Sequence, residues 1–482
     1  MKNIKFSIAS IFLFINLIIL IGCDEDIQGP VVDLENNGFE SVTVAEVLVK
    51  TCATSGCHGG SNPAGGLSTQ THSGLLRGSA NRSPELGNGF GGEAVIPFNS
   101  EKSLVYQVLN QNVIPIEPHQ NINVDSERIN IIKNWIDQGA RDFNGNVPSS
   151  NPSYRVFVCN QASDVVSIID GDKWVVSRLA DVSFNQTIDA PHMVKEHGDH
   201  YYVTLIAAGK LLKIRKSDNA IVNETNGIER AGMIQISPNA NVAYVSRSST
   251  SPGIYNSVYA VALDNMSIIS EISLPVTGVP HAIALTADGK KLYVANLTKD
   301  RISVVNAETN EFVEDIILDQ GTEPMEASIS PDGNYLYVSG MGSNKLIVIN
   351  TQTEQVISSI DVNHMPMHIA VSSTGNRIYV STMMMSTVDV IEKSGNTWSM
   401  IKRISHPGFN MLHGCDLSPN DDYLFVSSRN LDGMYEPKIK INGEGNNGTL
   451  GIINTQLLEV VKVIDLKEFP SGLVVEAHDH QH

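Results

Sequence analysis

The chain has 482 residues, of which 41% are hydrophobic and 18% are charged, so it is long enough for two or three domains with separate cores. Its 33 basic residues are outnumbered by 52 acidic residues, which gives a formal net charge of −19. Such an acidic surface repels phosphate backbones, so the composition argues against a nucleic-acid partner.

The N-terminus has the pattern of a bacterial export signal. Two lysines precede an apolar run over residues 6–21, which is shorter than the roughly 20 residues of a membrane span. The following Leu-Ile-Gly-Cys23 resembles a lipobox, in which Cys23 carries the lipid; an ordinary cleaved signal or an uncleaved anchor is the alternative. We therefore expect residues 1–23 to be a lipoprotein signal peptide and residues 24–40 a linker. The mature protein would be extracytoplasmic and lipid-anchored to a bacterial membrane, on the periplasmic side or at the cell surface.

The segment after this linker begins and ends with a predicted helix. Apolar residues recur on one side of residues 41–50, as expected for a short helix. They recur again at helical spacing between Asp125, which is typical of an N-cap, and Gly139, which is typical of a helix stop.

Two cysteines and a histidine directly follow the first of these helices. In Cys52-Ala53-Thr54-Ser55-Gly56-Cys57-His58, the two thiols are placed to attach a haem c covalently, and the histidine is placed to bind its iron. The common form of this motif has two residues between the cysteines, whereas this chain has four. A plain disulfide or a metal-binding knuckle is the alternative interpretation.

Several short sequence blocks between the two helices and at the end of the second one support a haem. They are Ala64-Gly65-Gly66-Leu67, Leu75-Leu76-Arg77-Gly78, Val95-Ile96-Pro97, Lys102-Ser103-Leu104-Val105-Tyr106 and Trp135-Ile136-Asp137-Gln138-Gly139-Ala140. In this order they resemble the small single-haem cytochrome c domains of planctomycete and Bacteroidetes proteins. The resemblance implies a small all-α cytochrome c domain over residues 41–143, carrying one haem c on Cys52 and Cys57 with His58 as the proximal iron ligand.

The chain departs from that family at the distal iron ligand. The family has a Met-Pro pair before the last helix, where this chain has Glu117-Pro118, and no methionine occurs between Met1 and Met193. His119 lies on the expected loop and is the favoured distal ligand, with His72 as the weaker candidate. If both are surface histidines, the sixth iron position is open. An imidazole in place of a thioether lowers the reduction potential, and an open position admits small ligands.

A repeat occupies the rest of the chain, after a linker over residues 144–153. An aromatic residue followed by valine recurs at intervals of 42–49 residues, starting at Phe157, Tyr202, Tyr244, Tyr293, Tyr337, Tyr379 and Phe425. This period, with four short strands per unit, predicts an all-β seven-bladed propeller over residues 154–482. The units resemble the YVTN family of propeller repeats. Residues 470–475 have the pattern of an inner strand and are expected to pair with the first blade and close the ring.

Histidines and methionines recur where the inner strands of the propeller are expected to begin. The positions are His192, His281, Met325, Met367, His368 and His413. The turns there would lie at the mouth of the central channel, together with the loops at 383–385 and 429–448. Imidazoles with thioethers suit copper, and dihaem nitrite reductases join a cytochrome c to a propeller that holds a second haem, so an additional copper or haem is one hypothesis. The alternatives are imidazoles that only bond a neighbouring blade's backbone, and methionines that form a docking surface.

Two further cysteines, Cys159 and Cys415, fall in strand-like segments. We interpret them as buried thiols, with a disulfide as the alternative.

The sequence therefore predicts an exported cytochrome lipoprotein that transfers electrons through one haem, with a propeller that binds a redox partner protein or a substrate. An electron carrier is favoured over a catalyst. One alternative is an oxidoreductase with its own metal or haem in the propeller, and another is a surface recognition protein with a structural haem. The oligomeric state is left open.

Overall fold

The computed structural model describes residues 34–78, 94–238, 242–248 and 255–476. The predicted signal peptide and Cys23 lie outside the described residues. None of the helices in the described part of the chain is long and apolar enough to cross a membrane.

The described residues of the N-terminal region form short helices and one short strand. The α-helices are α1 (Val42–Cys52), α2 (His72–Leu76), α3 (Leu104–Leu109) and α4 (Ser126–Asp137). The 3₁₀ helices are η1 (Ala64–Gly66), η3 (Ser100–Lys102) and η4 (His119–Asn121), and the strand is β1 (Val113–Ile114).

The two helices predicted from the sequence, α1 and α4, are both present with side-chain caps. The Ser41 hydroxyl accepts a hydrogen bond from the backbone N–H of Val44. The Asp125 carboxylate accepts one from the backbone N–H of Arg128 at 2.9 Å. These caps pair backbone N–H groups that have no partner within the helix. The apolar faces of α1 and α4 then pack into one core with Leu75, Val95 and Leu109.

A glycine is required where α4 ends. Gly139 has a φ of +105°, and a Cβ atom placed there would lie 2.7 Å from the Cζ atom of Phe98. Both the backbone conformation and the close ring exclude other residues.

This region is not purely helical, which corrects the all-α expectation. Strand β1 pairs antiparallel with β27 (Lys440–Ile441), Val113 opposite Ile441 and Ile114 opposite Lys440. The physical reason is that the extended backbone at β1 has N–H and C=O groups that need partners. The partner strand lies in the long insertion of the last propeller blade, more than 300 residues further along the chain.

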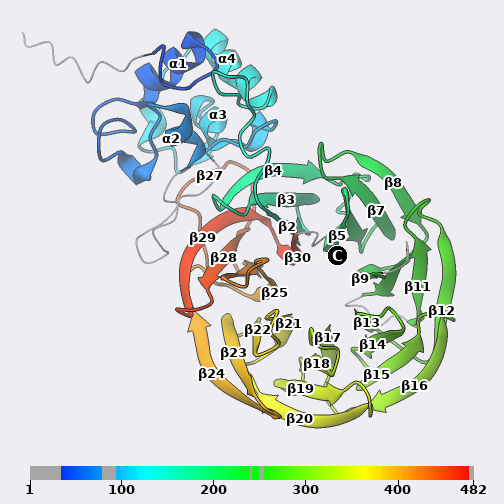
Figure 1. Ribbon diagram of the computed structural model, residues 1–482. Coiled ribbons are helices and arrows are strands. Elements are labelled where there is room, and N and C mark those ends of the chain that lie inside the picture. Colours follow the sequence, from blue (N-terminus) through cyan, green and yellow to red (C-terminus); the bar gives the residue numbers. More distant parts are fainter. Residues whose placement is uncertain (1–33, 79–93, 239–241, 249–254, 477–482) are drawn as a thin grey trace, which may run out of the picture. The chain divides into compact units, whose positions relative to one another are not determined.

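The C-terminal domain is a seven-bladed β-propeller in which each blade is a four-stranded antiparallel sheet (Figure 1). From the inner strand outward, three blades are β5 (Pro191–His197), β6 (His200–Leu205), β7 (Lys210–Arg215), β8 (Ile221–Asn226); β9 (Ala231–Ile236), β10 (Val242–Arg247), β11 (Tyr255–Ala262), β12 (Ile268–Gly278); and β13 (Pro280–Leu285), β14 (Lys291–Asn296), β15 (Arg301–Asn306), β16 (Glu311–Ile317). The next three are β17 (Pro324–Ile329), β18 (Tyr335–Gly340), β19 (Lys345–Asn350), β20 (Gln355–Asp361); β21 (Pro366–Val371), β22 (Arg377–Thr382), β23 (Thr387–Ser394), β24 (Thr397–Ser405); and β25 (Leu412–Leu417), β26 (Tyr423–Ser428), β28 (Asn447–Asn454), β29 (Glu459–Glu468).

The seventh sheet joins the two ends of the propeller, as predicted. Its strands are β30 (Pro470–Val475), β2 (Arg155–Asn160), β3 (Val165–Asp170) and β4 (Val175–Asp181). Val475 lies opposite Val156 and Val474 opposite Phe157. This pairing closes the ring and covers the edge of β2 that would otherwise be exposed.

The repeated aromatic–valine pair lies on the second strand of every blade. The aromatic side chains are at most 3% exposed, so the repeat is the core pattern of the blades. A serine that directly follows the valine forms a hydrogen bond to the adjacent blade. Ser339 donates to the carbonyl oxygen of Met367, and Ser427 donates to that of Ser471, both at 2.6 Å. These bonds fix the positions at which the inner strands begin.

The last two cysteines are buried and free. Cys159 lies in β2 and Cys415 in β25, and neither forms a disulfide. The prediction of buried thiols is confirmed.

Candidate functional site

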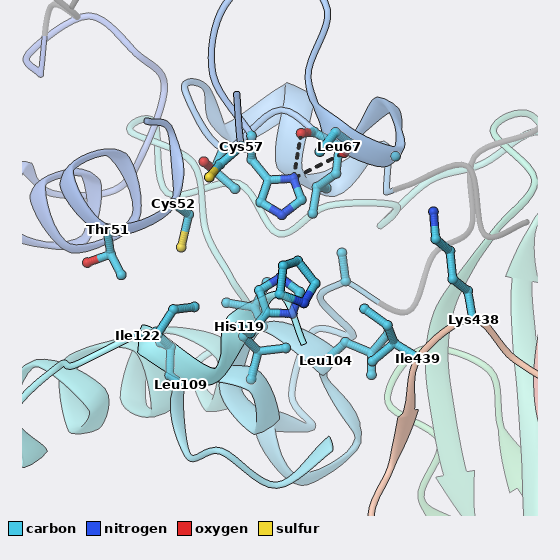
Figure 2. A pocket seen from close by; sticks show the side chains of 18 of the residues that line it. Thr51, Cys52, Cys57, Leu67, Leu104, Leu109, His119, Ile122, Lys438 and Ile439 are labelled. Atoms are coloured by element: carbon cyan, nitrogen blue, oxygen red, sulfur yellow. Dashed lines mark hydrogen bonds between the residues drawn. The ribbon is translucent and has the colours of Figure 1, made fainter. Parts of the chain in front are cut away.

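A pocket of about 320 Å³ opens between α1, α3 and η4 in the N-terminal region. Figure 2 shows Cys52 and Cys57 at its edge and His119 pointing into it. Its walls are mostly apolar, and the lining residues used below are Cys52, Cys57, His58, Leu67, Val105, Val108, Leu109, His119 and Ile122.

The chain folds back on itself between the two cysteines. After α1 ends, the N–H of Cys57 donates to the carbonyl oxygen of Thr54, and the N–H of His58 donates to that of Cys52, both at 3.0 Å. These bonds bring Cys52, Cys57 and His58 to one pocket although the motif has two extra residues. Neither cysteine forms a disulfide.

The Cys52 thiol does not resemble that of a redox-active or metal-binding cysteine. Burial, with a contribution from Cys57, raises the pKa of Cys52 to about 12, so its thiol is protonated at neutral pH and is a poor nucleophile or metal ligand. Within the described ranges, no group of three or more His, Cys, Asp or Glu residues is arranged to hold a metal ion. The metal-knuckle alternative therefore finds no ligand set among these residues.

His58 is held in one tautomer. Its Nδ1 atom lies 3.2 Å from the carbonyl oxygens of both Ala64 and Leu67 (Figure 2). Carbonyl oxygens only accept hydrogen bonds, so Nδ1 carries the proton and Nε2 carries the free lone pair. This is the arrangement of an imidazole that binds a metal through Nε2.

His119 faces His58 across the pocket. The two ring centroids are 6.1 Å apart and the ring planes differ by only 10°. The backbone of His119 is fixed by hydrogen bonds to Ile116 at 2.7 Å and from the side chain of Gln111 at 3.1 Å. Its Nδ1 atom is buried without a hydrogen-bond partner among the described residues. Burial, and then His58, lower the pKa of His119, which favours a neutral ring with a free lone pair.

The spacing of the two imidazoles matches that of two ligands on one iron. Rings in direct contact would lie about 3.5–4 Å apart. A metal–nitrogen distance of about 2.0 Å on each side instead places the ring centroids roughly 6 Å apart. The two parallel rings with centroids 6.1 Å apart and the two thiols at the pocket's edge are a donor set that fits a haem c. The apolar walls of the pocket suit its macrocycle.

His72 lies elsewhere, in the core of the N-terminal region. Its Nε2 atom is 2.8 Å from the carbonyl oxygen of Ala140, and its ring packs edge-on against Phe39 and Trp135. It does not line the pocket. The structure thus brings His119, and not His72, opposite His58.

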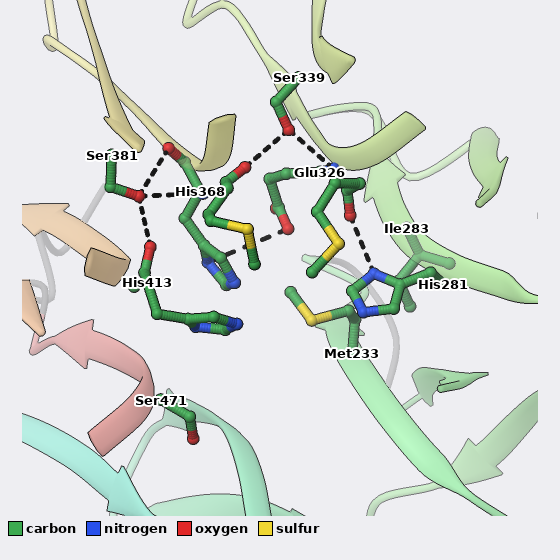
Figure 3. Close-up of polar contacts among 12 residues, drawn as sticks. Met233, His281, Ile283, Glu326, Ser339, His368, Ser381, His413 and Ser471 are labelled. Carbon is green, nitrogen blue, oxygen red and sulfur yellow. Dashed lines mark hydrogen bonds and ion pairs between the residues drawn. The ribbon is translucent and has the colours of Figure 1, made fainter. Parts of the chain in front are cut away.

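The histidines predicted at the channel mouth of the propeller form a second cluster. His192, His281, His368 and His413 are each at most 5% exposed, and Figure 3 shows the rings of the last three pointing toward one another. The ring centroids of His368 and His413 are 4.5 Å apart, and His192 lies 6.0 Å from His281 and 6.2 Å from His413. Met325 and Met367 pack with Met383 in an adjoining buried cluster.

Only one histidine of this cluster is seen, among the described residues, to bond the backbone of a neighbouring blade, which was one of the alternatives for these residues. The Nδ1 atom of His281 donates to the carbonyl oxygen of Met325, on the next blade, at 2.9 Å. In contrast, Nε2 of His192, Nε2 of His368 and both ring nitrogens of His413 have no hydrogen-bond partner in the described residues. Burial lowers the pKa of His281 to about 4 and that of His368 to about 3, and those of His192 and His413 well below the usual value. All four rings are therefore neutral at pH 7.

Sequence reasoning missed two charged residues beside this cluster, Glu326 and Arg429. Glu326 follows Met325 on β17 and is 7% exposed, with its Oε2 atom 4.0 Å from Nδ1 of His368. Burial raises its pKa from 4.5 to about 8. Arg429 directly follows β26. A signal for it exists in the repeat, because the equivalent position is uncharged in every other blade.

Replacing Glu326 by glutamine is expected to change how stability depends on pH. The folded chain holds the Glu326 proton up to about pH 8, whereas the unfolded chain releases it near pH 4.5, so the free energy of unfolding falls as the pH rises between these values. The variant lacks this loss and gains stability relative to the wild type from about pH 5 to about pH 8. Urea unfolding at both pH values measures this difference in the free energy of unfolding. Glu323→Gln, which changes an exposed side chain, is the control. The same dependence on pH for the wild type and both variants would refute the prediction.

Comparison with known proteins identifies the type of propeller. A family model described as lactonase, 7-bladed beta-propeller, matches residues 234–364. No curated protein matches the chain.

Solved structures are similar over the propeller. A functionally unknown protein from Desulfotomaculum acetoxidans is 20% identical, with a TM-score of 0.55, covering 67% of this chain and 99% of that one. The periplasmic gluconolactonase of Pseudomonas aeruginosa is 16% identical, with a TM-score of 0.54 and the same coverage. Hydrazine synthase from Kuenenia stuttgartiensis is 16% identical, with a TM-score of 0.50, covering 60% of this chain and 92% of that one. The C-terminal domain is thus a seven-bladed propeller of the lactonase and YVTN type, and at these identities the likeness shows the fold alone.

Proposed function

We propose that this protein is an exported c-type cytochrome that transfers electrons through one haem in its N-terminal region. The observation that supports this proposal best is the pair of parallel imidazoles, His58 and His119, whose centroids are 6.1 Å apart in an apolar pocket bordered by two free cysteines. The proposal includes a cytochrome c domain over residues 41–143 and lipid attachment through Cys23.

Each residue of the pocket has a defined role in this proposal. Cys52 and Cys57 would tether the macrocycle through thioether bonds, and His58 and His119 would bind the iron. The carbonyl oxygens of Ala64 and Leu67 hold the His58 ring in place, which keeps its Nε2 lone pair directed into the pocket. A bound haem would supply reversible one-electron oxidation and reduction.

The ligand set also sets the chemistry that the site performs. Two imidazoles, in place of an imidazole and a thioether, give a lower reduction potential. If His58 and His119 both bind the iron, no iron position would be free for a substrate, so the site would carry electrons and would not bind small ligands. Apolar side chains such as Leu109 and Ile122 exclude water from the pocket. We assign the propeller the role of a rigid platform for a redox partner protein.

The distal ligand is tested by replacing His119 with alanine and adding carbon monoxide to the reduced protein. The wild type is expected to show no spectral change because His58 and His119 would both bind the iron, whereas the variant is expected to bind the gas. His72→Ala is the matched control, since His72 bonds Ala140 in the core and its loss leaves the iron ligands unchanged. Carbon monoxide binding by the wild type, or by His72→Ala alone, would show that His119 is not the ligand.

A further inference from the structure

One ring of residues in the propeller includes direct neighbours of the histidine cluster. It consists of the residue that directly follows the second strand of each blade: Gln161, Ile206, Ser248, Leu297, Met341, Met383 and Arg429. The side-chain amide of Gln161 is 2.8 Å from Nδ1 of His192, and Leu297, Met341 and Met383 pack with the buried Met325 and Met367. Arg429 is the charged member of this ring.

The guanidinium of Arg429 has no acidic partner in the described part of the chain. Its backbone N–H donates to the carbonyl oxygen of Met411 at 3.1 Å, and its Cζ atom lies 4.5 Å from the centre of the Phe469 ring. Its Nε atom is buried without a hydrogen-bond partner among the described residues. Burial lowers the pKa of Arg429 to about 9, so the side chain is still a cation at neutral pH.

This positive charge acts on the four imidazoles. Arg429 contributes to the lowered pKa of His192, His281, His368 and His413. Lys195 adds a smaller positive contribution at His368, and at Glu326 it is the cation that lowers the pKa against the larger effect of burial. Because Glu326 is mostly protonated at pH 7 and the imidazoles are neutral, the cluster carries an uncompensated positive charge.

The same residues have hydrogen-bond donors without acceptors. A neutral imidazole always carries one N–H, and neither nitrogen of His413 has a partner in the described residues. The N–H of His368 is equally unpaired there, since its Nε2 atom has no partner and its Nδ1 atom is 4.0 Å from Glu326, beyond hydrogen-bond range. Each buried polar group left unpaired costs about 1–3 kcal/mol, so the cluster as described is incomplete.

Charge decides which kind of ligand would complete it. A metal cation would be repelled by Arg429, and no group of three His, Cys, Asp or Glu residues in the described ranges is arranged to hold one. An anion would instead neutralise the guanidinium and accept from the unpaired N–H groups. The ring centroids of His368 and His413 are 4.5 Å apart, which puts both rings within reach of one small ligand.

We propose that His368, His413 and Arg429 form a binding site for a small monovalent oxyanion at the channel mouth of the propeller. Two oxygen atoms on one planar anion match the fork of a guanidinium, so carboxylate and nitrate-like ions belong to the class. This site is independent of the haem and stands whether or not the N-terminal region carries one.

Titration calorimetry of the full-length protein with formate and with nitrate tests this site. We expect saturable binding to the wild type that chloride competes for poorly. Arg429→Gln should weaken binding at least tenfold, and Arg429→Lys should weaken it less because the charge remains while the planar fork is lost. Arg230→Gln is the matched control for nonspecific charge, since Arg230 is exposed and lies directly before inner strand β9.

Two further readouts keep the test decisive. Formate should raise the melting temperature of the wild type and of Arg230→Gln but not that of Arg429→Gln, and an unchanged haem spectrum would exclude binding at an iron. If Arg429→Gln does not fold, the affinity of Arg429→Lys decides. Absence of binding by the wild type would overturn the proposal. Equal affinities of the wild type, Arg429→Lys and, where it folds, Arg429→Gln would overturn it as well.

Discussion

Loss of all covalently bound haem is the expected result of replacing both Cys52 and Cys57 by serine. Under the proposed function, these thiols form the only covalent bonds to the macrocycle, and a hydroxyl does not form them. Any haem that still enters the pocket would be held by His58 and His119 alone and would be released on denaturation. Haem-dependent staining after a denaturing gel measures this directly, in protein produced together with a c-type maturation system.

The single variants and a distant cysteine provide the controls. Cys52→Ser or Cys57→Ser alone is expected to leave one thioether bond and a reduced amount of bound haem. Cys159→Ala should keep the wild-type amount, because Cys159 lies in the propeller strand β2. Covalent haem in the double variant would contradict the assignment of these thiols.

Removal of β30 is expected to have the largest effect on stability. In a chain that ends at Phe469, strand β2 keeps β3 but loses β30, and the ring is open at the edge that holds Val156 and Phe157. Leu473, Val474 and Val475, each at most 6% exposed, are lost from the core at about 2 kcal/mol per side chain. Their sum is comparable to the whole stability of a typical domain, about 5–15 kcal/mol.

A chain that ends at Glu476 is the matched control, since it lacks only the last six residues and keeps β30 (Figure 1). We expect it to melt like the wild type, while the chain ending at Phe469 aggregates or melts at a much lower temperature. Circular dichroism on heating, together with gel filtration, distinguishes the two. Equal melting temperatures would show that β30 does not close the ring.

The sequence predicts well those features that depend on local or repeated patterns. The caps at Ser41 and Asp125 each act on a residue three positions away, so α1 and α4 are visible in the sequence. The aromatic–valine pairs mark a blade core that must be built again in each repeat. Ring closure by residues 470–475 follows because the first blade lacks an inner strand before it in the chain.

Features that depend on long-range packing are hidden from the sequence. The pairing of β1 with β27 joins segments more than 300 residues apart, and neither segment has a strong strand pattern. The loop position made His119 the favoured candidate, but the parallel orientation of its ring and that of His58 depends on how η4 packs. Arg429 was overlooked because a charge at the start of a long insertion is ordinarily exposed to solvent.

The covalent haem content of the wild-type protein after c-type maturation is the most direct test of the proposed function. One haem per chain that stays bound after denaturation, with the absorption spectrum of a six-coordinate iron, is the predicted result. Absence of covalent haem, in cells that mature a reference cytochrome c normally, would contradict it.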